Sequence, residues 1–245
     1  MISIVKRRFT TVLLCAVLVT CMLASAASAE PKKKSYKPLS QYEERKLERW
    51  TVYVEKSLLE NHPKLAAEAL RVAENQLFNI TRVVPEQAVK KLRQVPVWMQ
   101  YECKDMKCAA YHPSKRWLTE HGYNPKKAKC VDIGNARNFV RWTKDQWWMV
   151  LHEMAHAYHD RFLGFGNADI KAGYERVKKA GLYKEVRQWR GGQQRHYALE
   201  NHKEYFAEMT EAYFGVNDFY PFVRAEMKEC DPKTLKLIEE LWGRK

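Results

Sequence analysis

The sequence contains no apolar run of the length that a membrane-spanning helix needs. Residues 12–24 are apolar, but this run is too short for a comfortable span. Basic residues 6–8 precede the run, and an Ala-x-Ala cleavage pattern follows it at residues 27–29. We therefore expect residues 1–29 to be a signal peptide, and the mature protein to be secreted, extracellular or periplasmic, without a stable membrane anchor. An uncleaved anchor and a lipoprotein signal at Cys21 are the alternatives.

The chain also lacks a nucleic-acid-binding motif, although it is strongly basic. It has 43 Lys and Arg residues against 29 Asp and Glu residues; removal of residues 1–29 takes away three positive charges and no acids, so +14 becomes +11. The basic residues are scattered, which is typical of a solvated surface rather than of specific binding to nucleic acid or to an anionic membrane or polymer. The one dense cluster, Lys32–Lys34 with Lys37, lies in residues 30–48, which we expect to be a mobile amino-terminal tail.

No two cysteines have the Cys-x-x-Cys spacing that is common in structural zinc sites. The mature chain has four cysteines: Cys103, Cys108, Cys130 and Cys230. An even number after a signal peptide favours two disulfides, with three possible pairings. Cys103 and Cys130 flank the segment between them and could tether it. A structural zinc site is the rival interpretation, which the four-residue gap between Cys103 and Cys108 disfavours.

The centre of the sequence carries a His-Glu-x-x-His motif, formed by His152, Glu153 and His156. No Gly or Pro interrupts residues 142–163, and apolar residues recur at helical spacing, so a helix is predicted here. Positions four apart share one face of a helix, and two neutral imidazoles there can bind one Zn²⁺ at roughly 2.0–2.1 Å each. Glu153 can then accept a proton from a water that the ion holds. By chance this motif is expected only about 0.02 times in a chain of this composition.

Residues 195–215 offer candidates for a third metal ligand. We predict that they form a second helix, which ends at Gly215. The helix carries four glutamates on or near one stripe: Glu200, Glu204, Glu208 and Glu211. Such a stripe is usually a solvated face, but aromatic and apolar residues interleave it, so we expect a buried helix whose carboxylates need a partner. Glu204 as a ligand and Glu208 as an acceptor for a ligand histidine form one Glu-x-x-x-Glu pair. Glu200 and Glu204 form another, and the spacing alone leaves the choice open.

These stretches resemble the catalytic domain of anthrax lethal factor and its relatives among secreted zinc metallopeptidases. The likeness covers roughly the C-terminal half of the chain and lies in residues 152–157, 197 and 201–208. Residues 231–238 also look similar to the helix that closes that domain. The resemblance implies Glu204, in preference to Glu200, as the third zinc ligand. It also implies that Tyr197, seven residues before that glutamate, faces the zinc-bound substrate. The chain is too short to supply the translocation-binding and large substrate-docking domains of the toxin.

The order of predicted elements is that of an α+β, zincin-like domain. Strands are predicted at 50–54, 95–101 and 129–133, and helices at 63–80, 85–92, 142–163, 195–215 and 232–242, with a further helix that could start at 41–47. We expect a small mixed sheet with metal-binding helices, in one domain that spans residues 49–245. The strand of Val131 precedes the metal helix, so we expect it to edge the substrate cleft, where an extended peptide could add to its free edge.

The other histidines have weaker claims to the site. His159 could be a ligand or a hydrogen-bond partner of one, but the longer His-Glu-x-x-His-x-x-Gly-x-x-His motif fails there. His196 and His202 could stabilise an oxyanion or could equally be solvated. His112 we expect to be an exposed loop residue, outside the site.

Together these features predict a secreted zinc metallopeptidase that hydrolyses peptide bonds in peptide or protein substrates. His152, His156 and Glu204 would bind Zn²⁺. Glu153 would act as the general base, and Tyr197 would donate a hydrogen bond to the tetrahedral oxyanion. Two other functions stay open: a zinc hydrolase of a non-peptide amide, such as a cell-wall amide, and a non-catalytic secreted zinc-binding protein. The intact Glu153 disfavours the second, because a structural zinc site has no use for a base.

Overall fold

The computed structural model describes residues 36–103 and 106–243. Contacts within the chain divide it into two units, residues 1–33 and 34–245, and the described residues belong to the second. The predicted signal peptide and the Lys32–Lys34 cluster lie outside the described residues. Among the helices that the structure describes, none combines the length and the apolar character of a membrane span.

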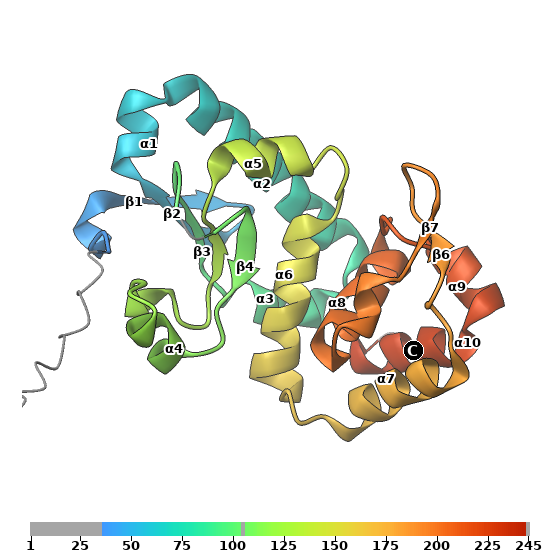
Figure 1. Ribbon diagram of the computed structural model, residues 1–245. Helices are drawn as coiled ribbons and strands as arrows, with labels where there is room; N and C mark the ends of the chain where they lie inside the picture. Colours follow the sequence, from blue (N-terminus) through green and yellow to red (C-terminus); the bar gives the residue numbers. More distant parts are fainter. Residues whose placement is uncertain (1–35, 104–105, 244–245) are drawn as a thin grey trace, which may run out of the picture. The chain divides into compact units, whose positions relative to one another are not determined.

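A five-stranded mixed sheet forms one part of the second unit (Figure 1). In the order in which they lie in the sheet, its strands are β1 (Tyr42–Leu47), β2 (Trp50–Glu55), β3 (Val97–Met99), β5 (Val131–Ile133) and β4 (Ala109–Tyr111). β2, β3 and β5 run parallel to one another, whereas β1 and β4 are antiparallel strands at the two edges. Every residue of β3 and β5 is buried, and Asp132 is the one charged residue among them. The prediction of an α+β fold with a small mixed sheet is confirmed.

The first two strands form a hairpin that the sequence pattern does not predict. Glu48 and Arg49 connect β1 to β2, and both have positive φ angles, 46° and 72°. Two-residue turns of this kind usually contain Asn or Gly, so Glu-Arg gives no recognisable turn signal. β1 pairs with β2 along its whole length. The interpretation of residues 30–48 as a tail, and of 41–47 as the start of a helix, is therefore wrong from Tyr42 onward.

The free edge of the sheet beyond β5 belongs to β4. β5 bonds to β3 on one side and to β4 on the other. The expectation that the strand of Val131 presents a free edge to the cleft is therefore wrong. β4 escapes prediction because it has only three residues, two of them alanines, which have low β-propensity.

Ten α-helices accompany the sheets in the described part of the chain. They are α1 (Lys56–Asn61), α2 (Pro63–Val83), α3 (Glu86–Leu92), α4 (Lys115–Glu120), α5 (Ala136–Trp142), α6 (Met149–Tyr158), α7 (Ala168–Ala180), α8 (His202–Phe214), α9 (Arg224–Cys230) and α10 (Pro232–Leu241). The predicted helices at 63–80, 85–92 and 232–242 correspond to α2, α3 and α10. Proline begins both α2 and α10, at the first helical position, where the missing N–H has no helical partner to lose.

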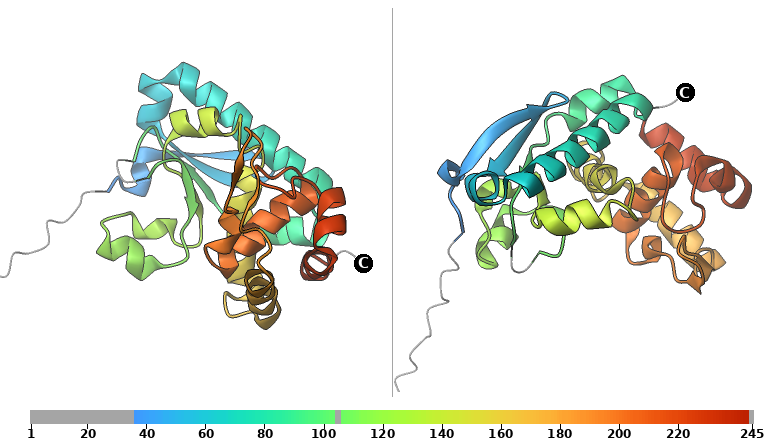
Figure 2. Two further views of the ribbon diagram at one scale, coloured as in Figure 1. Left: turned by 45° about the vertical axis from the view of Figure 1, so that its right-hand side comes forward. Right: turned by 90° about the horizontal axis from the view of Figure 1, so that it is seen from above.

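α6 lies between the sheet and a second group of helices (Figures 1 and 2). It contacts β4 and β5 on one side and packs along α8 on the other. α7, α9 and α10 pack around α8, and α2 contacts both α5 and α6. Because α6 is enclosed in this way, only a narrow strip of its surface remains for a functional site.

Residues 142–163 form more than the one helix that is predicted. α5 ends at Trp142, turns follow, and α6 continues into a π-helical turn at His159–Leu163. Trp148, just before α6, packs on Gly215, where any side chain would collide with the indole ring. A contact between residues so distant in sequence cannot be read from periodicity, which is why the break is missed.

The helix predicted at 195–215 begins later and ends where expected. α8 starts at His202, after the cap residue Asn201, whose Oδ1 accepts two backbone N–H groups of the first turn. It ends just before Gly215, and residues 205–214 are all buried. The prediction of a buried helix that carries glutamates is confirmed.

Three of the mature cysteines are thiols in the structure, contrary to the prediction of two disulfides. They are Cys108, Cys130 and Cys230. Sγ of Cys108 lies 3.4 Å from Sδ of Met149, and burial raises the pKa of this thiol to about 12. Two groups of side chains within residues 36–103 and 106–243 could hold a metal ion, and neither group includes a cysteine. The rival structural zinc site is therefore not supported either.

Candidate metal centre

α6 is buried except for the strip that carries the His-Glu-x-x-His motif. Seven of its residues are buried, and the three that are partly exposed are His152, Glu153 and His156. The start of the helix has no side-chain cap of its own, but Oε1 of Gln76, in α2, accepts the N–H of Val150 at 2.9 Å. The surrounding helices thus fix α6 and leave the three motif residues facing one cavity.

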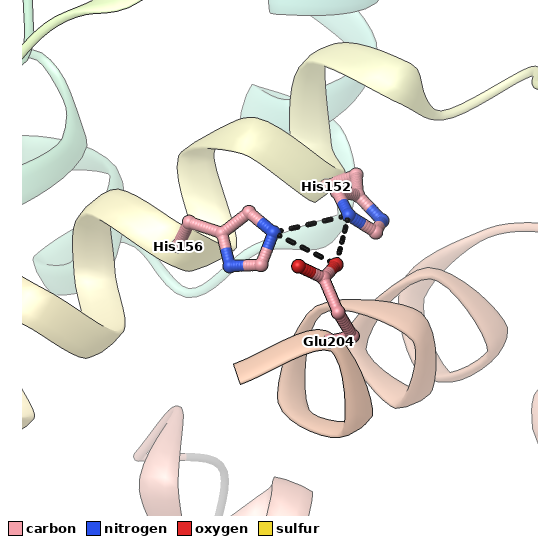
Figure 3. Close-up of side chains that lie close together, drawn as sticks. All are labelled: His152, His156 and Glu204. Carbon is pink, nitrogen blue, oxygen red and sulfur yellow. Dashed lines mark hydrogen bonds and ion pairs between the residues drawn. The ribbon is translucent and has the colours of Figure 1, made fainter. Parts of the chain in front are cut away.

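The two histidines of α6 meet Glu204 of α8 (Figure 3). Nε2 of His152 lies 3.1 Å from Nε2 of His156 and 3.1 Å from Oε2 of Glu204, and Nε2 of His156 lies 3.2 Å from the same oxygen. Ligands that bind a tetrahedral ion at roughly 2.0–2.1 Å are about 3.3 Å apart. These three atoms, the ligand triangle, therefore have the spacing of zinc ligands and could hold a metal ion. Glu200 is not part of it, because its carboxylate pairs with Arg195 at the surface.

The chemistry of the donor atoms favours a cation within the ligand triangle. Nδ1 of His152 lies 2.7 Å from Oε1 of Glu211, and an ionised carboxylate only accepts, so this nitrogen is the one that carries the proton when the ring is neutral. Nε2 of His152 then directs a lone pair toward the lone pairs of His156 and Glu204. One proton can bridge only one of these pairs, whereas a metal ion satisfies all three atoms.

The charges around the ligand triangle act on the pKa values of its members. Burial lowers the pKa of His152, but hydrogen bonds with Glu204 and Glu211 outweigh burial and raise this pKa well above its usual value. Burial raises the pKa of Glu204, but its contacts with His152 and His156 reverse the effect and hold the pKa well below the usual range. The site is therefore built to attract positive charge, and a metal ion would compete with protons for it.

Glu211, rather than Glu208, is the principal partner of the His152 ring. Oε1 of Glu208 lies 3.5 Å from Nδ1 of His152, against 2.7 Å for Glu211. Asn217 donates to Oε2 of Glu208 at 2.8 Å, and burial together with the charge of Glu211 raises the pKa of Glu208 well above normal. The role that the sequence assigned to Glu208 therefore passes to Glu211. The available signal was its position seven residues after Glu204, on the same helical face.

Glu153 is held against the edge strand of the sheet. The backbone N–H of Tyr111, in β4, donates to Oε2 of Glu153 at 2.7 Å. Cys108 and His112 bond through their backbones to residues that flank β5. Since alternate residues of a strand bond in opposite directions, the backbone groups of Ala109 face the same way as the N–H of Tyr111. β4 therefore positions the carboxylate and presents its outer edge to the cavity.

A single cavity of about 450 Å³ joins the five predicted site residues. They are His152, Glu153, His156, Tyr197 and Glu204. Tyr197 lies in a 3-10 turn before α8, with its side chain 47% exposed, and burial together with the charge of Glu204 raises its pKa, so the phenol keeps its proton. Asp218, which the sequence did not single out, also lines the cavity; burial and the charge of Glu211 raise its pKa to about 6.

In the described structure, this cavity is not lined by any of the other histidines that the sequence suggested, which are His112, His159, His196 and His202. His112, expected to be exposed, is buried with Nε2 3.2 Å from the carboxylate of Asp132. His159 is buried among aromatic rings, so it does not join the ligand triangle. His196 is buried and His202 bonds to a backbone carbonyl, so neither is placed to stabilise an oxyanion.

Comparisons with protein-family models, with curated proteins and with solved structures give no match for this chain. The resemblance to the lethal factor catalytic domain therefore stays a prediction that rests on residues 152–157, 197 and 201–208. The function of the site has to be inferred from its own geometry and chemistry.

Proposed function

We propose that the chain is a zinc-dependent metallopeptidase with a zincin-like α+β domain. The observation that carries this proposal is the ligand triangle, with contacts of 3.1–3.2 Å, beside Glu153 in one cavity. Structural zinc sites are closed by four protein ligands, whereas catalytic sites use three and keep one position open. Three donors at the wall of a cavity fit the catalytic kind.

The residues around the ligand triangle can divide the work of hydrolysis. A zinc ion at the triangle would supply a Lewis acid and lower the pKa of water at the site. Glu153 can take the proton of the attacking water and deliver it to the leaving amine. The hydrogen bond from Tyr111 holds one oxygen of this carboxylate, so the other oxygen can face the water. The neutral phenol of Tyr197 can donate to the oxyanion, which is worth about 2.7–4 kcal/mol for a well-placed donor.

An extended peptide is the form of substrate that this cavity suits best. β4 is an edge strand that lines the cavity with Ala109, Ala110 and Tyr111. Addition of a strand to such an edge is a common way of binding an extended peptide. This favours peptides or proteins over a non-peptide amide as substrates, and the position of Glu153 favours catalysis over zinc binding alone.

Secretion is part of the proposal and rests on the sequence of residues 1–29. The protein would act outside the cytoplasm, extracellularly or in a periplasm, with no stable membrane anchor after cleavage. Its partner would be the substrate, and no specific nucleic acid is expected.

The test is digestion of a peptide library by the mature protein, with zinc content measured in parallel. We expect about one zinc ion per chain. Internal peptide bonds should be cleaved, a chelator should abolish cleavage, and added zinc should restore it. Zinc-loaded protein that cleaves only a cell-wall amide, or nothing, would support one of the two alternative functions. Stoichiometric zinc in His156→Ala would show that the ligand set is wrong.

A further inference from the structure

The cavity at the metal centre continues into a longer groove. Three hollows adjoin one another because they share lining residues. The cavity shares Trp142, Gln146 and Asp218 with a second hollow, and the second shares Gln188 and Trp189 with a third. The groove therefore extends from the ligand triangle, past the turns between α5 and α6, to the small hairpin of β6 (Val186–Arg187) and β7 (Gln193–Gln194).

Two exposed tryptophans stand at the far end of this groove. Trp147, 36% exposed, belongs to the turns before α6, and Trp189, 37% exposed, belongs to the hairpin. Their rings are 5.1 Å apart at an angle of 62°. Two rings at this angle form a corner, which suits the edge and face of a third aromatic ring.

Both walls of the groove are tied to the rest of the protein. Trp148, the neighbour of Trp147, packs on Gly215. The backbone N–H of Trp189 donates to the carbonyl of Asp218 at 3.0 Å. Arg190 of the hairpin forms an ion pair with Asp145 of the opposite wall. A groove that is already formed loses less conformational entropy when a ligand binds.

β4 gives the direction in which a peptide would lie. Cys108, just before the strand, has its Sγ 3.4 Å from Sδ of Met149 at the start of α6, whereas Tyr111, at the end of the strand, donates to the general base. Asn138 of α5 donates to the carbonyl of Lys107 at 2.6 Å, so the α5 side of the groove lies at the start of β4. A peptide paired antiparallel to β4, the more common arrangement, directs its C-terminal residues to that side.

We propose that this groove binds the polypeptide substrate on the C-terminal side of the scissile bond and takes an aromatic side chain against the corner that Trp147 and Trp189 form. The inference rests on the proposed peptidase function and names the class of substrate: a polypeptide with an aromatic residue downstream of the cleaved bond. The tryptophans touch no reacting atom. They would contribute to binding of long substrates and leave short ones unaffected.

The first experiment compares cleavage by Trp147→Ala and Trp189→Ala with cleavage by the wild-type protein. Trp117→Ala is the matched control, because Trp117 is 44% exposed on α4 and lines none of the three hollows. Wild-type digestion of a peptide library should enrich Phe, Tyr or Trp at one position downstream of the cut. Both groove variants should lose this preference, with kcat/KM for long peptides reduced roughly two- to tenfold, mainly through KM. Zinc content and cleavage of short peptides should not change.

A second experiment measures binding without catalysis. The Glu153→Gln protein is applied to an immobilised peptide library, with and without Trp147→Ala. Aromatic-dependent binding that Trp147→Ala weakens would support the groove, even if the wild-type protein cleaved nothing and the proposed activity were lost. The groove would be overturned by an unchanged aromatic preference in both tryptophan variants or by the absence of any peptide binding. Tryptophan-dependent binding of peptidoglycan fragments instead of peptides would also overturn it.

Discussion

The imidazole of His152 is held between two carboxylates of one helix. Its Nε2 lies 3.1 Å from Glu204 and its Nδ1 lies 2.7 Å from Glu211. Glu204 and Glu211 are seven residues apart on α8, so both face α6. The packing of α6 against α8 therefore sets the position of one proposed metal ligand, Glu204, and the orientation of a second, His152, in one step. Any change in the Glu211 contact should therefore change the affinity of the site for zinc.

Glu211→Gln should weaken zinc binding more than Glu208→Gln. The amide keeps the size of the side chain but loses the charge that holds the proton on Nδ1 of His152, and partners of this kind contribute about 10–100-fold to metal affinity. Glu208 lies farther from the ring and favours its protonated form, so its replacement should have little effect. Competition with a chromophoric chelator measures the zinc affinity of both variants. A larger loss for Glu208→Gln would restore the role that the sequence suggested.

Glu204→Gln should lose most of its zinc, whereas Glu200→Gln should bind zinc as the wild type does. A neutral amide is a poor ligand for zinc, and Glu204 is the only glutamate that meets both Nε2 atoms in the described structure. Glu200 pairs with Arg195 at the surface and is exposed, which makes it a matched control on the neighbouring turn. Metal analysis after dialysis gives the result. The reverse outcome would mean that Glu200 is the ligand.

The candidate metal site could be predicted from the sequence because its signals are local. His152 and His156 share a helical face by spacing alone, and the aromatic residues between the glutamates marked α8 as buried. The choice of Glu204 over Glu200 came from the family resemblance, since the spacing fits both pairs. In the structure Glu204 meets the two histidines and Glu200 does not, because of how α6 crosses α8, which no local pattern encodes.

The rest of the site depends on contacts between distant segments. β4 is too short to give a strand signal, yet it holds Glu153 and forms the edge of the sheet. Whether Glu208 or Glu211 meets the His152 ring depends on the rotation of α8 by a fraction of a turn. Asp218 follows α8 and the hairpin of Trp189 precedes it, yet both line the groove together with the turns before α6. These contacts arise from tertiary packing, so the periodicity of the sequence does not predict them.

Glu153→Gln should keep its zinc and its fold but lose about 10²–10⁴-fold in kcat, because the amide cannot accept the proton of the attacking water. The side chain is nearly isosteric and is not part of the ligand triangle, so the metal should stay bound. Steady-state kinetics with a peptide from the library, together with metal analysis, measures the effect. Wild-type turnover in this variant would rule out the proposed mechanism.

Tyr197→Phe should keep zinc and leave KM nearly unchanged, while kcat falls by about 10²–10³-fold if the phenol donates to the oxyanion. The bond would form mainly in the transition state, so substrate binding does not depend on it. The exposed position of Tyr197 makes a folding defect unexpected. A rise in KM with unchanged kcat would instead assign the tyrosine to substrate binding.

A second buried charge cluster, away from the candidate metal centre, should govern the acid stability of the protein. Asp132 of β5 is fully buried, and Nζ of Lys127, itself 3% exposed, lies 2.6 Å from its carboxylate. His112 lies 3.2 Å from the same oxygen. Burial raises the pKa of Asp132, but the charges of Lys127 and His112 outweigh it and lower the pKa below its ordinary value. The ionised form is therefore the one that the fold stabilises.

Asp132→Asn should cost roughly 3–5 kcal/mol in the free energy of unfolding at pH 7, because it leaves the buried Lys127 without its carboxylate. The folded pKa of Asp132 lies below the unfolded value of about 3.9, so its contribution is fully present above that pH and is lost as the pH falls through the folded pKa. The difference between the variant and the wild type should therefore shrink below about pH 4.

Urea unfolding at pH 7 and at low pH measures this difference in the free energy of unfolding, with a chelator present so that metal release plays no part. Glu86→Gln removes an exposed pair with Lys90 and should match the wild type at pH 7. An equal loss at both pH values would show that packing, not charge, makes Asp132 important.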